Sequence, residues 1–235
     1  MATLNLCIDI GNTSTKAALF NEGKEIHYWK PFTASIFKEI TYNQNVSILV
    51  SKTGKNEDLE ALISPKFYLN HEYHLPLKLN YKTPETLGPD RIATAAGVLA
   101  IDSQNPWAII DLGTCLTLDL IVENTFLGGL ISPGVQMRFR AMHEFTAALP
   151  SVDMDFNISF PGKSTKESMQ IGVCQSIMYE ITGYISMLNK RYSKLNVMDC
   201  SSLALNFDKD LKNKIFARPK LVLYGLNYIL EQNAN

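Results

Sequence analysis

Two short segments of the chain combine an acidic side chain, a glycine and hydroxyl side chains in the same order. The first is Asp9-Ile10-Gly11-Asn12-Thr13-Ser14-Thr15, and the second is Asp111-Leu112-Gly113-Thr114-Cys115-Leu116-Thr117. Glycine lets the backbone turn sharply, and consecutive N–H groups in such a turn form a concave site for an anion. A carboxylate repels phosphate, so both acids make sense where a cation lies between carboxylate and phosphate. The pair therefore predicts two loops that hold the phosphates of a nucleotide.

The elements that must position these loops are strands and their hairpins. Asp and Gly are common in ordinary turns, so one copy alone is weak support for function, and two copies in the same setting are stronger. The expected strands cover residues 4–10, 15–20 and 26–29, and again 107–112, 116–122 and 126–131. This repeat is typical of the actin-like ATPase architecture. We therefore predict an α/β fold of two similar ribonuclease-H-like halves, residues 1–105 and 106–235, each a mixed sheet with flanking helices.

Hydrophobic periodicity and breaker residues predict the remaining elements. Ser164 and Glu167 match the capping box that begins a helix. Residues 64–89 hold four prolines and predict a long loop region. Helices are expected at residues 35–40, 57–63, 90–101, 134–148, 164–191 and 221–231, and further strands at 46–50 and 196–198.

Composition excludes several classes of function. The chain has 235 residues and a formal net charge of -1, which argues against a nucleic-acid-binding surface. No apolar stretch approaches the roughly 18 residues that span a bilayer, and no secretory signal is expected. The four cysteines lie far apart, so reduced thiols and a cytoplasmic location are expected. Gly162-Lys163-Ser164 imitates the end of a P-loop, but Asn157 stands where its first glycine belongs.

The order and spacing of the motifs resemble the type III pantothenate kinases. The resemblance rests on the two loops above, on Gly88-Pro89-Asp90-Arg91 and on Gly128-Gly129-Leu130-Ile131-Ser132-Pro133-Gly134, and it runs from about residue 4 to residue 190. It implies phosphorylation of pantothenate by ATP to 4'-phosphopantothenate, the first step toward coenzyme A. It also implies a homodimer with the substrate site near the subunit interface, Mg²⁺ with ATP, and a monovalent cation, K⁺ or NH₄⁺.

The resemblance also implies roles for individual residues. Asp90 matches the general base, which agrees with the need of phosphoryl transfer for a carboxylate near the attacking hydroxyl. The implied ATP-binding residues are Asp9, Ile10, Gly11, Asn12, Thr13, Ser14, Thr15, Lys16 and Thr114. The implied substrate-binding residues are Tyr81, Gly88, Pro89, Asp90, Arg91 and Thr165. The implied cation ligands are Asp111 for the monovalent ion and Asp9 for Mg²⁺ through ATP.

Each of these residues also has an ordinary structural interpretation. Asp90 could cap the helix that it precedes, and Arg91 could be a surface charge. Tyr81 could be a packed loop aromatic, Thr165 could serve the start of its helix, and Lys16 could face solvent.

The chain departs from the family pattern at three places. Pro89 replaces a small residue, and Cys115 takes the usual alanine position. Met198-Asp199-Cys200-Ser201 stands where the family often has T-G-G near the adenine, which leaves nucleotide preference open. Two alternatives to a pantothenate kinase therefore remain. One is another kinase or a phosphatase on the same fold, and the other is a non-catalytic, transcription-associated accessory factor.

Overall fold

The structure is a computed structural model that describes residues 4–201, 203 and 215–234. It divides into two compact units. Unit 1 comprises Met1–Gln104, Ile121–Gly128 and Lys220–Asn235, and unit 2 comprises Asn105–Leu120 and Gly129–Pro219. The division of the sequence into two repeated halves, 1–105 and 106–235, stays a prediction. The two compact units are a different kind of division, and the C-terminal helix belongs to unit 1.

Unit 1 is built on a four-stranded sheet whose strand order is β3-β2-β1-β4. Strand β1 pairs antiparallel with β2, β2 pairs antiparallel with β3, and β1 pairs parallel with β4. The bounds are Leu4–Ile10 for β1, Thr15–Asn21 for β2, Lys24–Trp29 for β3 and Val46–Lys52 for β4. The predicted antiparallel meander is confirmed. Because β1 and β4 are parallel, their carboxyl ends lie side by side, with Ile10 opposite Lys52.

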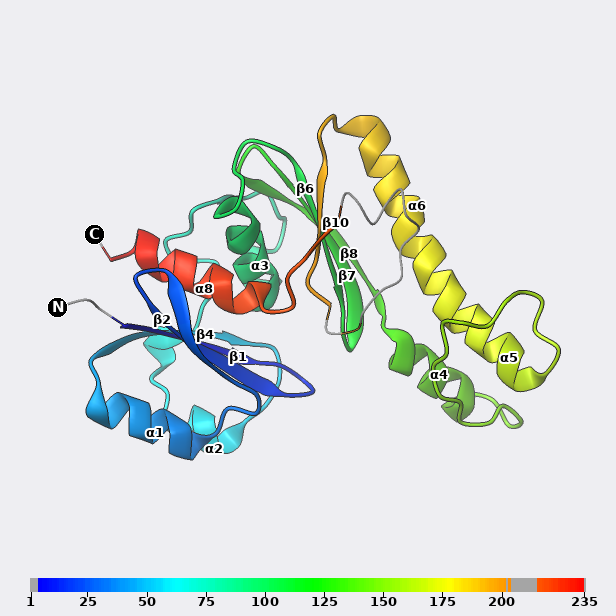
Figure 1. Ribbon diagram of the computed structural model, residues 1–235, viewed down its shortest axis with the longest axis horizontal. Coiled ribbons are helices and arrows are strands. Elements are labelled where there is room, and N and C mark those ends of the chain that lie inside the picture. Colours follow the sequence, from blue (N-terminus) through cyan, green and yellow to red (C-terminus); the bar gives the residue numbers. More distant parts are fainter. Residues whose placement is uncertain (1–3, 202, 204–214, 235) are drawn as a thin grey trace. The chain divides into compact units, whose positions relative to one another are not determined.

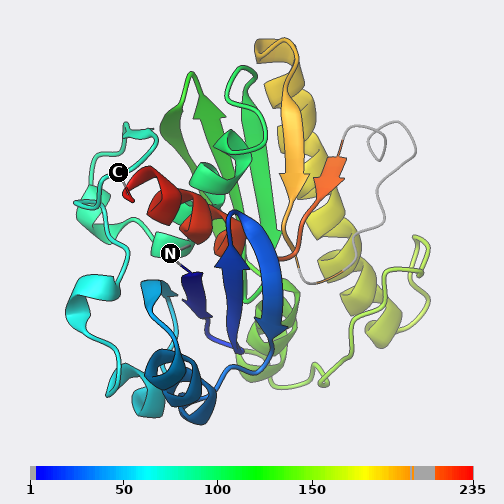
Figure 2. The same ribbon diagram turned by 60° about the vertical axis from the view of Figure 1, so that its left-hand side comes forward.

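Helices cover both faces of this sheet (Figure 1). On one face, side chains of β1 pack against α1 (Ala34–Asn43) and α2 (Glu57–Glu60) in a single apolar cluster. The other face carries α3 (Pro89–Leu99) and α8 (Leu221–Gln232), and Figure 2 shows α8 lying across the strands. Helices α3 and α8 touch closely, since a side chain at Gly225 would meet the backbone of α3.

The second sheet has six strands in the order β10-β9-β6-β7-β8-β5. Their bounds are Trp107–Leu112 for β6, Cys115–Val122 for β7, Thr125–Pro133 for β8, Asn196–Asp199 for β9, Ile215–Ala217 for β10 and Lys78–Leu79 for β5. The three strands of the second loop's half are confirmed. The short strands β5 and β10 were not predicted, because two or three residues carry no measurable alternation.

Unit 2 contains α4 (Val135–Glu144), α5 (Thr165–Gln170) and α6 (Ser176–Arg191). One π-helical turn, η3 (Ile171–Gln175), joins α5 to α6, so the predicted helix over 164–191 is nearly continuous. Ser164 accepts a hydrogen bond from the Glu167 N–H, as predicted for the cap. None of the described helices is long and apolar enough to cross a membrane.

Two predicted helices are too long. Helix α4 ends at Glu144 rather than 148, because the Thr146 hydroxyl donates to the Met142 carbonyl and accepts from the Leu149 N–H. Such local side-chain bonds compete with the helical ladder. Helix α2 ends at Glu60 rather than 63, and residues 61–63, which were predicted to be helical, form tight turns before Pro65. Pro65 and Pro84 each begin a short 3₁₀ turn, η1 (Pro65–Phe67) and η2 (Pro84–Thr86), within the predicted loop.

Candidate functional site

The first loop connects β1 to β2 in unit 1 and is a compact turn. The Gly11 N–H donates to the Ser14 carbonyl at 3.2 Å, which closes the turn. Asn12 and Thr13 are exposed at its tip, whereas Ile10 and Thr15 are buried at its base. The loop therefore presents polar groups at its tip and is anchored by the sheet below, as an anion site requires.

Asp9 is the buried acid at the base of this loop, with 8% of its surface exposed. Its register partners are Lys16 on β2 and Ser51 on β4. Burial raises the pKa of Asp9 to about 6, Lys16 lowers it, the charge of Asp90 raises it, and Ser51 lowers it. The charge of Asp90 therefore acts on Asp9, so the two predicted acids of unit 1 are electrostatically coupled.

A cavity of about 390 Å³ opens beside the first loop. Five consecutive loop residues, 11–15, form one side of it. The opposite side comes from residues 31–34, at the start of α1, and from Lys55, Asn56 and Asp58, around the start of α2. The loop that the sequence singled out therefore lines a cavity.

Asp90 lies in the first turn of α3, after Gly88 as the cap and Pro89. Its Oδ1 accepts a hydrogen bond from the Arg91 N–H at 2.8 Å. Burial raises the pKa of Asp90, while this bond and the Arg91 charge lower it. A Cβ at Gly88 would lie 2.5 Å from the Asp90 carboxylate oxygen, so a side chain there would displace that carboxylate. Because Gly88 is the cap and Asp90 lies inside the helix, the interpretation of Asp90 as the helix cap is wrong, and its bond from the adjacent Arg91 N–H does not exclude a chemical role.

Arg91 is buried, with 7% exposed, and lies against two aromatic rings. Its guanidinium carbon is 5.9 Å from the ring centre of Tyr81 and 5.5 Å from that of Phe126. The two rings meet edge to face at 5.8 Å, and Gly128 (φ 95°) leaves room beside Tyr81. The structure thus gathers Tyr81 and Arg91, and the surface-charge interpretation of Arg91 is wrong.

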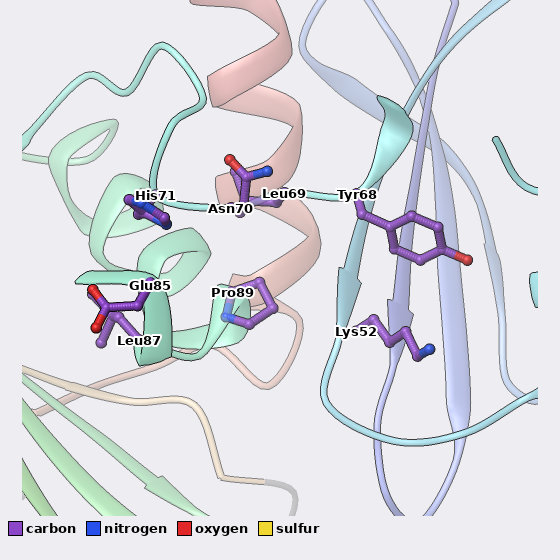
Figure 3. Close-up of a pocket in the computed structure, with 8 residues that line it drawn as sticks. All are labelled: Lys52, Tyr68, Leu69, Asn70, His71, Glu85, Leu87 and Pro89. Carbon is purple, nitrogen blue, oxygen red and sulfur yellow. The ribbon is translucent and has the colours of Figure 1, made fainter. Parts of the chain in front are cut away.

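A second cavity, of about 250 Å³, adjoins the same segment (Figure 3). Leu87 and Pro89 line it on the α3 side, and Lys52 and Tyr68 line it at the end of β4. Glu85 and His71 add polar groups, and Lys52 is paired with Glu60. Neither Asp90 nor Arg91 lines this cavity.

The second loop connects β6 to β7 in unit 2 and has the same kind of turn as the first. The Gly113 N–H donates to the Cys115 carbonyl at 2.9 Å. Asp111 is half-buried at its base, and Thr114 is exposed. A Cβ at Gly134 would lie within 2.5 Å of the Gly113 and Thr114 carbonyl oxygens, so the backbone of α4's cap is tight against this loop.

The segment 198–201, which departs from the family pattern, is fastened to the second loop. The Ser201 hydroxyl accepts from the Leu112 N–H at 2.8 Å, and the Asp199 carboxylate accepts from the Ser201 N–H at 2.9 Å. Burial, followed by the charges of Asp111, Asp199 and Asp119, raises the pKa of Cys200. The Ser201 side chain therefore supports the backbone of the second loop. The glycines that the family often has in this segment are absent from 198–201.

Thr165 is exposed at the first position of α5 in unit 2, next to the capping Ser164. The predicted residues of unit 1 are 9–16, Tyr81 and 88–91, and those of unit 2 are Asp111, Thr114 and Thr165. Within unit 1, Asp9 and Asp90 interact, and so do Tyr81 and Arg91.

The donor set around the loops suits a cation that arrives with phosphate. Among the described residues, no group of three or more His, Cys, Asp or Glu side chains could hold a metal alone. At sites that bind nucleotide phosphates, Mg²⁺ is usually held by one or two carboxylates and the phosphates themselves. Asp9 fits that arrangement, because burial disfavours its ionised form and a cation would favour it.

Sequence reasoning missed two contributors to these sites. Phe126 supports Arg91 and Tyr81, and residues 53–56 lie against the first loop. An aromatic residue before Gly128-Gly129 and the Thr53-Gly54 turn were the available signals. Neither pattern reveals which distant residues Phe126 or residues 53–56 contact.

Comparison with known proteins gives one consistent result. A family model described as type III pantothenate kinase matches residues 56–187. Curated proteins named type III pantothenate kinase match nearly the whole chain. That of Cytophaga hutchinsonii is 37% identical and covers 98% of this chain and 100% of its own, and that of Phocaeicola vulgatus is 35% identical with 98% and 99% covered.

Solved structures agree on the fold. A putative Baf family transcriptional activator from Campylobacter jejuni has a TM-score of 0.57 at 22% identity, with 98% of this chain and 99% of its own covered. A putative 2-dehydro-3-deoxygalactonokinase from Sinorhizobium meliloti has a TM-score of 0.61 at 10% identity, with 97% and 99% covered. The predicted α/β class with two ribonuclease-H-like halves is confirmed.

Proposed function

Because this chain belongs to the type III pantothenate kinase family, we propose that it transfers the γ-phosphate of ATP to pantothenate in coenzyme A synthesis. Enzymes of this family are kinases, and the pantothenate hydroxyl is the acceptor that their name specifies. The observation that supports the assignment to residues is that the charge of Asp90 raises the pKa of Asp9 at the base of the first loop.

The phosphates of ATP are held at the first loop by residues 9–16, and Thr114 of the second loop adds a further contact. The cavity beside residues 11–15 supports this part of the proposal. Backbone N–H groups of the turn and the hydroxyls of Thr13, Ser14 and Thr15 are the donors that an oxyanion needs. Lys16, whose charge acts on Asp9, balances the buried acid from the neighbouring strand.

Asp90 is the general base in this proposal. The pantothenate hydroxyl oxygen attacks the γ-phosphorus, its proton passes to the Asp90 carboxylate, and the bond to the bridging oxygen of ADP breaks. Such transfers depend mainly on positioning and on neutralising charge, and a positioned base contributes about 10²- to 10⁴-fold. The bond from the Arg91 N–H fixes one carboxylate oxygen, which leaves the other oriented for the hydroxyl.

The carboxylate of pantothenate binds at Arg91. A guanidinium that is stacked on rings and shielded from water interacts strongly with an anion and discriminates against a neutral analogue. Tyr81, Gly88, Pro89 and Thr165 complete the substrate contacts, as in the family pattern. The buried stack of Arg91 on Tyr81 and Phe126 supports the first of these assignments.

Two cations accompany the reaction. Asp9 would hold the Mg²⁺ that accompanies ATP, and the ion would supply charge neutralisation to the phosphates. A monovalent ion, K⁺ or NH₄⁺, is held by Asp111. The Asp111 carboxylate and the carbonyl oxygens of the second loop are the oxygen ligands that hard cations prefer.

The enzyme acts as a homodimer in the cytoplasm, and α6 offers the face for a second copy. Tyr179 and Met187 are 71% and 54% exposed, and Gly183 lies between them on the same side of the helix. A Cβ at Gly183 would meet nothing within 4 Å. A mid-helix glycine costs about 1 kcal/mol relative to alanine, so its presence is explained if another chain approaches closely there.

The test of the function is phosphate transfer from ATP to pantothenate with Mg²⁺, in K⁺ and in Na⁺ buffers. We expect phosphopantothenate to form, and to form faster in K⁺. Acetate and sugars serve as alternative acceptors, and they should give no product. No transfer to pantothenate in either buffer, by protein that is folded and dimeric, would overturn the proposal and favour an accessory role.

A further inference from the structure

Residues 53–56, between β4 and α2, are fastened to the first phosphate loop. The backbone N–H groups of Thr53 and Gly54 both donate to the Ile10 carbonyl, at 2.9 and 2.8 Å. A Cβ at Gly54 would lie 2.2 Å from the Gly11 carbonyl oxygen, a distance that no real side chain tolerates. The segment therefore lies directly on the backbone of the loop.

Asn56 fixes the other end of the segment. Its side-chain amide donates to the Thr15 hydroxyl at 3.0 Å, and its side-chain oxygen accepts from the Leu59 N–H at 3.2 Å. Its own backbone N–H donates to the Glu60 carboxylate at 2.8 Å. Asn56 thus ties the end of the phosphate loop to the start of α2, and residue 55 is held between two anchored neighbours.

Lys55 lines the cavity that the loop also lines. Among the lining residues that the structure describes, it is the one with a basic side chain, and Asp58 is the one with an acidic side chain. Lys55 is exposed, and its charge lowers the pKa of Glu60 less than the hydrogen bond from Lys52 does. Lys52 is committed to Glu60 by an ion pair, which leaves Lys55 as the cation on the cavity side.

We propose that residues 53–56 form a second wall of the nucleotide phosphate site, in which the Lys55 ammonium contacts the terminal phosphates. This inference rests on the proposed ATP site and adds to it a residue outside the loop. Lys16 pairs in register with Asp9 and does not line this cavity, so Lys55 adds a basic side chain from outside the loop. Asp58 repels bare phosphate, so the cavity is suited to a phosphate that carries Mg²⁺ rather than to a free anion.

The experiment measures binding of Mg·ATP and of Mg-tripolyphosphate by calorimetry to the wild-type protein and to Lys55→Ala, Lys55→Arg and Lys66→Ala. A hydrogen bond between charged groups predicts that Lys55→Ala weakens both ligands about 10- to 100-fold. Lys55→Arg keeps the charge and should stay within about threefold. Lys66, an exposed lysine on η1 whose ammonium lies over the Phe67 ring, is the matched control and should bind as wild type.

The outcomes separate this inference from the function on which it rests. If the wild type binds Mg·ATP and Lys55→Ala binds it equally well, the role of Lys55 is overturned while the kinase assignment stands. If the wild type binds no nucleotide, both fall. Steady-state kinetics add a second criterion, because a phosphate contact raises the KM for ATP and leaves the KM for pantothenate unchanged. Equal rises in both would show a merely structural effect and overturn the contact.

Discussion

Asp90→Asn separates the proposed role of Asp90 as chemical base from its hydrogen bond within the first turn of α3. Asparagine keeps an Oδ1 acceptor for the Arg91 N–H, which Asp90 now bonds at 2.8 Å, so the first turn of α3 keeps its bond. The variant loses a charge near a helix N-terminus, a change of about 0.3–1 kcal/mol. It also removes a buried charge that disfavours the ionised form of Asp9, so the two stability effects oppose each other.

The predicted loss of activity is much larger than the loss of stability. Removal of a general base costs about 10²- to 10⁴-fold in kcat, or about 3–5.5 kcal/mol in the barrier. The KM for ATP should change little, since the phosphate loop is untouched. The base must be ionised and burial raises the pKa of Asp90, so wild-type kcat/KM should fall as the pH falls through a value above that of an ordinary aspartate. The residual activity of the variant should lack this step.

The assay is a coupled ADP-release measurement across pH, with thermal unfolding of the same samples. Asp102→Asn is the matched control, because the Asp102 carboxylate also accepts a backbone N–H, from Gln104, beyond the far end of α3. It should keep wild-type kinetics. A loss below tenfold in Asp90→Asn, or loss of ATP binding in step with turnover, would refute the assignment of Asp90 as base.

Four further changes test other parts of the structure. Asp111→Ala should abolish the difference between rates in K⁺ and Na⁺, and an unchanged K⁺ response would contradict the assigned ligand. Arg91→Lys should raise the KM for pantothenate about tenfold or more and leave the KM for ATP unchanged. The reason is that an ammonium cannot stack between two rings or bind a carboxylate with two parallel bonds. A KM for pantothenate equal to that of the wild type would exclude a substrate contact. Burial raises the pKa of Asp9 to about 6. Between about pH 4 and 6 the ligand-free native state therefore keeps a proton on Asp9 that the unfolded chain has lost. The free energy of unfolding should fall as the pH rises through this range. Asp9→Asn should remove that fall and gain up to about 3 kcal/mol at pH 8 in urea unfolding, whereas parallel pH profiles would contradict the burial argument. Gly183→Arg should fold normally, since the site is open, and should sediment as a monomer; a stable dimer would exclude this face.

The fold was largely predictable because its elements carry strong local signals. The apolar strands before each loop, the turn glycines and the cap at Ser164 all act within a few residues, and β1, β2, β6 and β7 lie where the sequence placed them. Errors occurred where distant or short contacts decide. Strand β5 forms because two residues pair with β8, and the end of α4 depends on one hydroxyl.

The site was predictable in part for the same reason. Motifs identified the loops and the segment 88–91, but the surroundings of Arg91 depend on Phe126, which lies 35 positions further along the chain. Likewise, no local pattern shows that Gly54 must touch Gly11. Contacts of this kind are set by strand order, and a single sequence does not reveal which strand neighbours which.

The electrostatics of unit 1 explain why such a site should bind nucleotide together with its cation. Asp9 is buried and lies in the field of Asp90, so in the ligand-free protein burial and the Asp90 charge both make the ionised form of Asp9 less favourable. In the proposed site, Asp9 would face the divalent ion that accompanies ATP, and its ionised form would then stabilise the complex instead of destabilising the fold. Because Asp90, as the proposed base, must be ionised to accept a proton, a positive charge near Asp9 would also favour the active form of that base. We therefore expect binding of the phosphate donor and activation of the proposed base to be linked through Asp9 on β1 and Asp90 on α3.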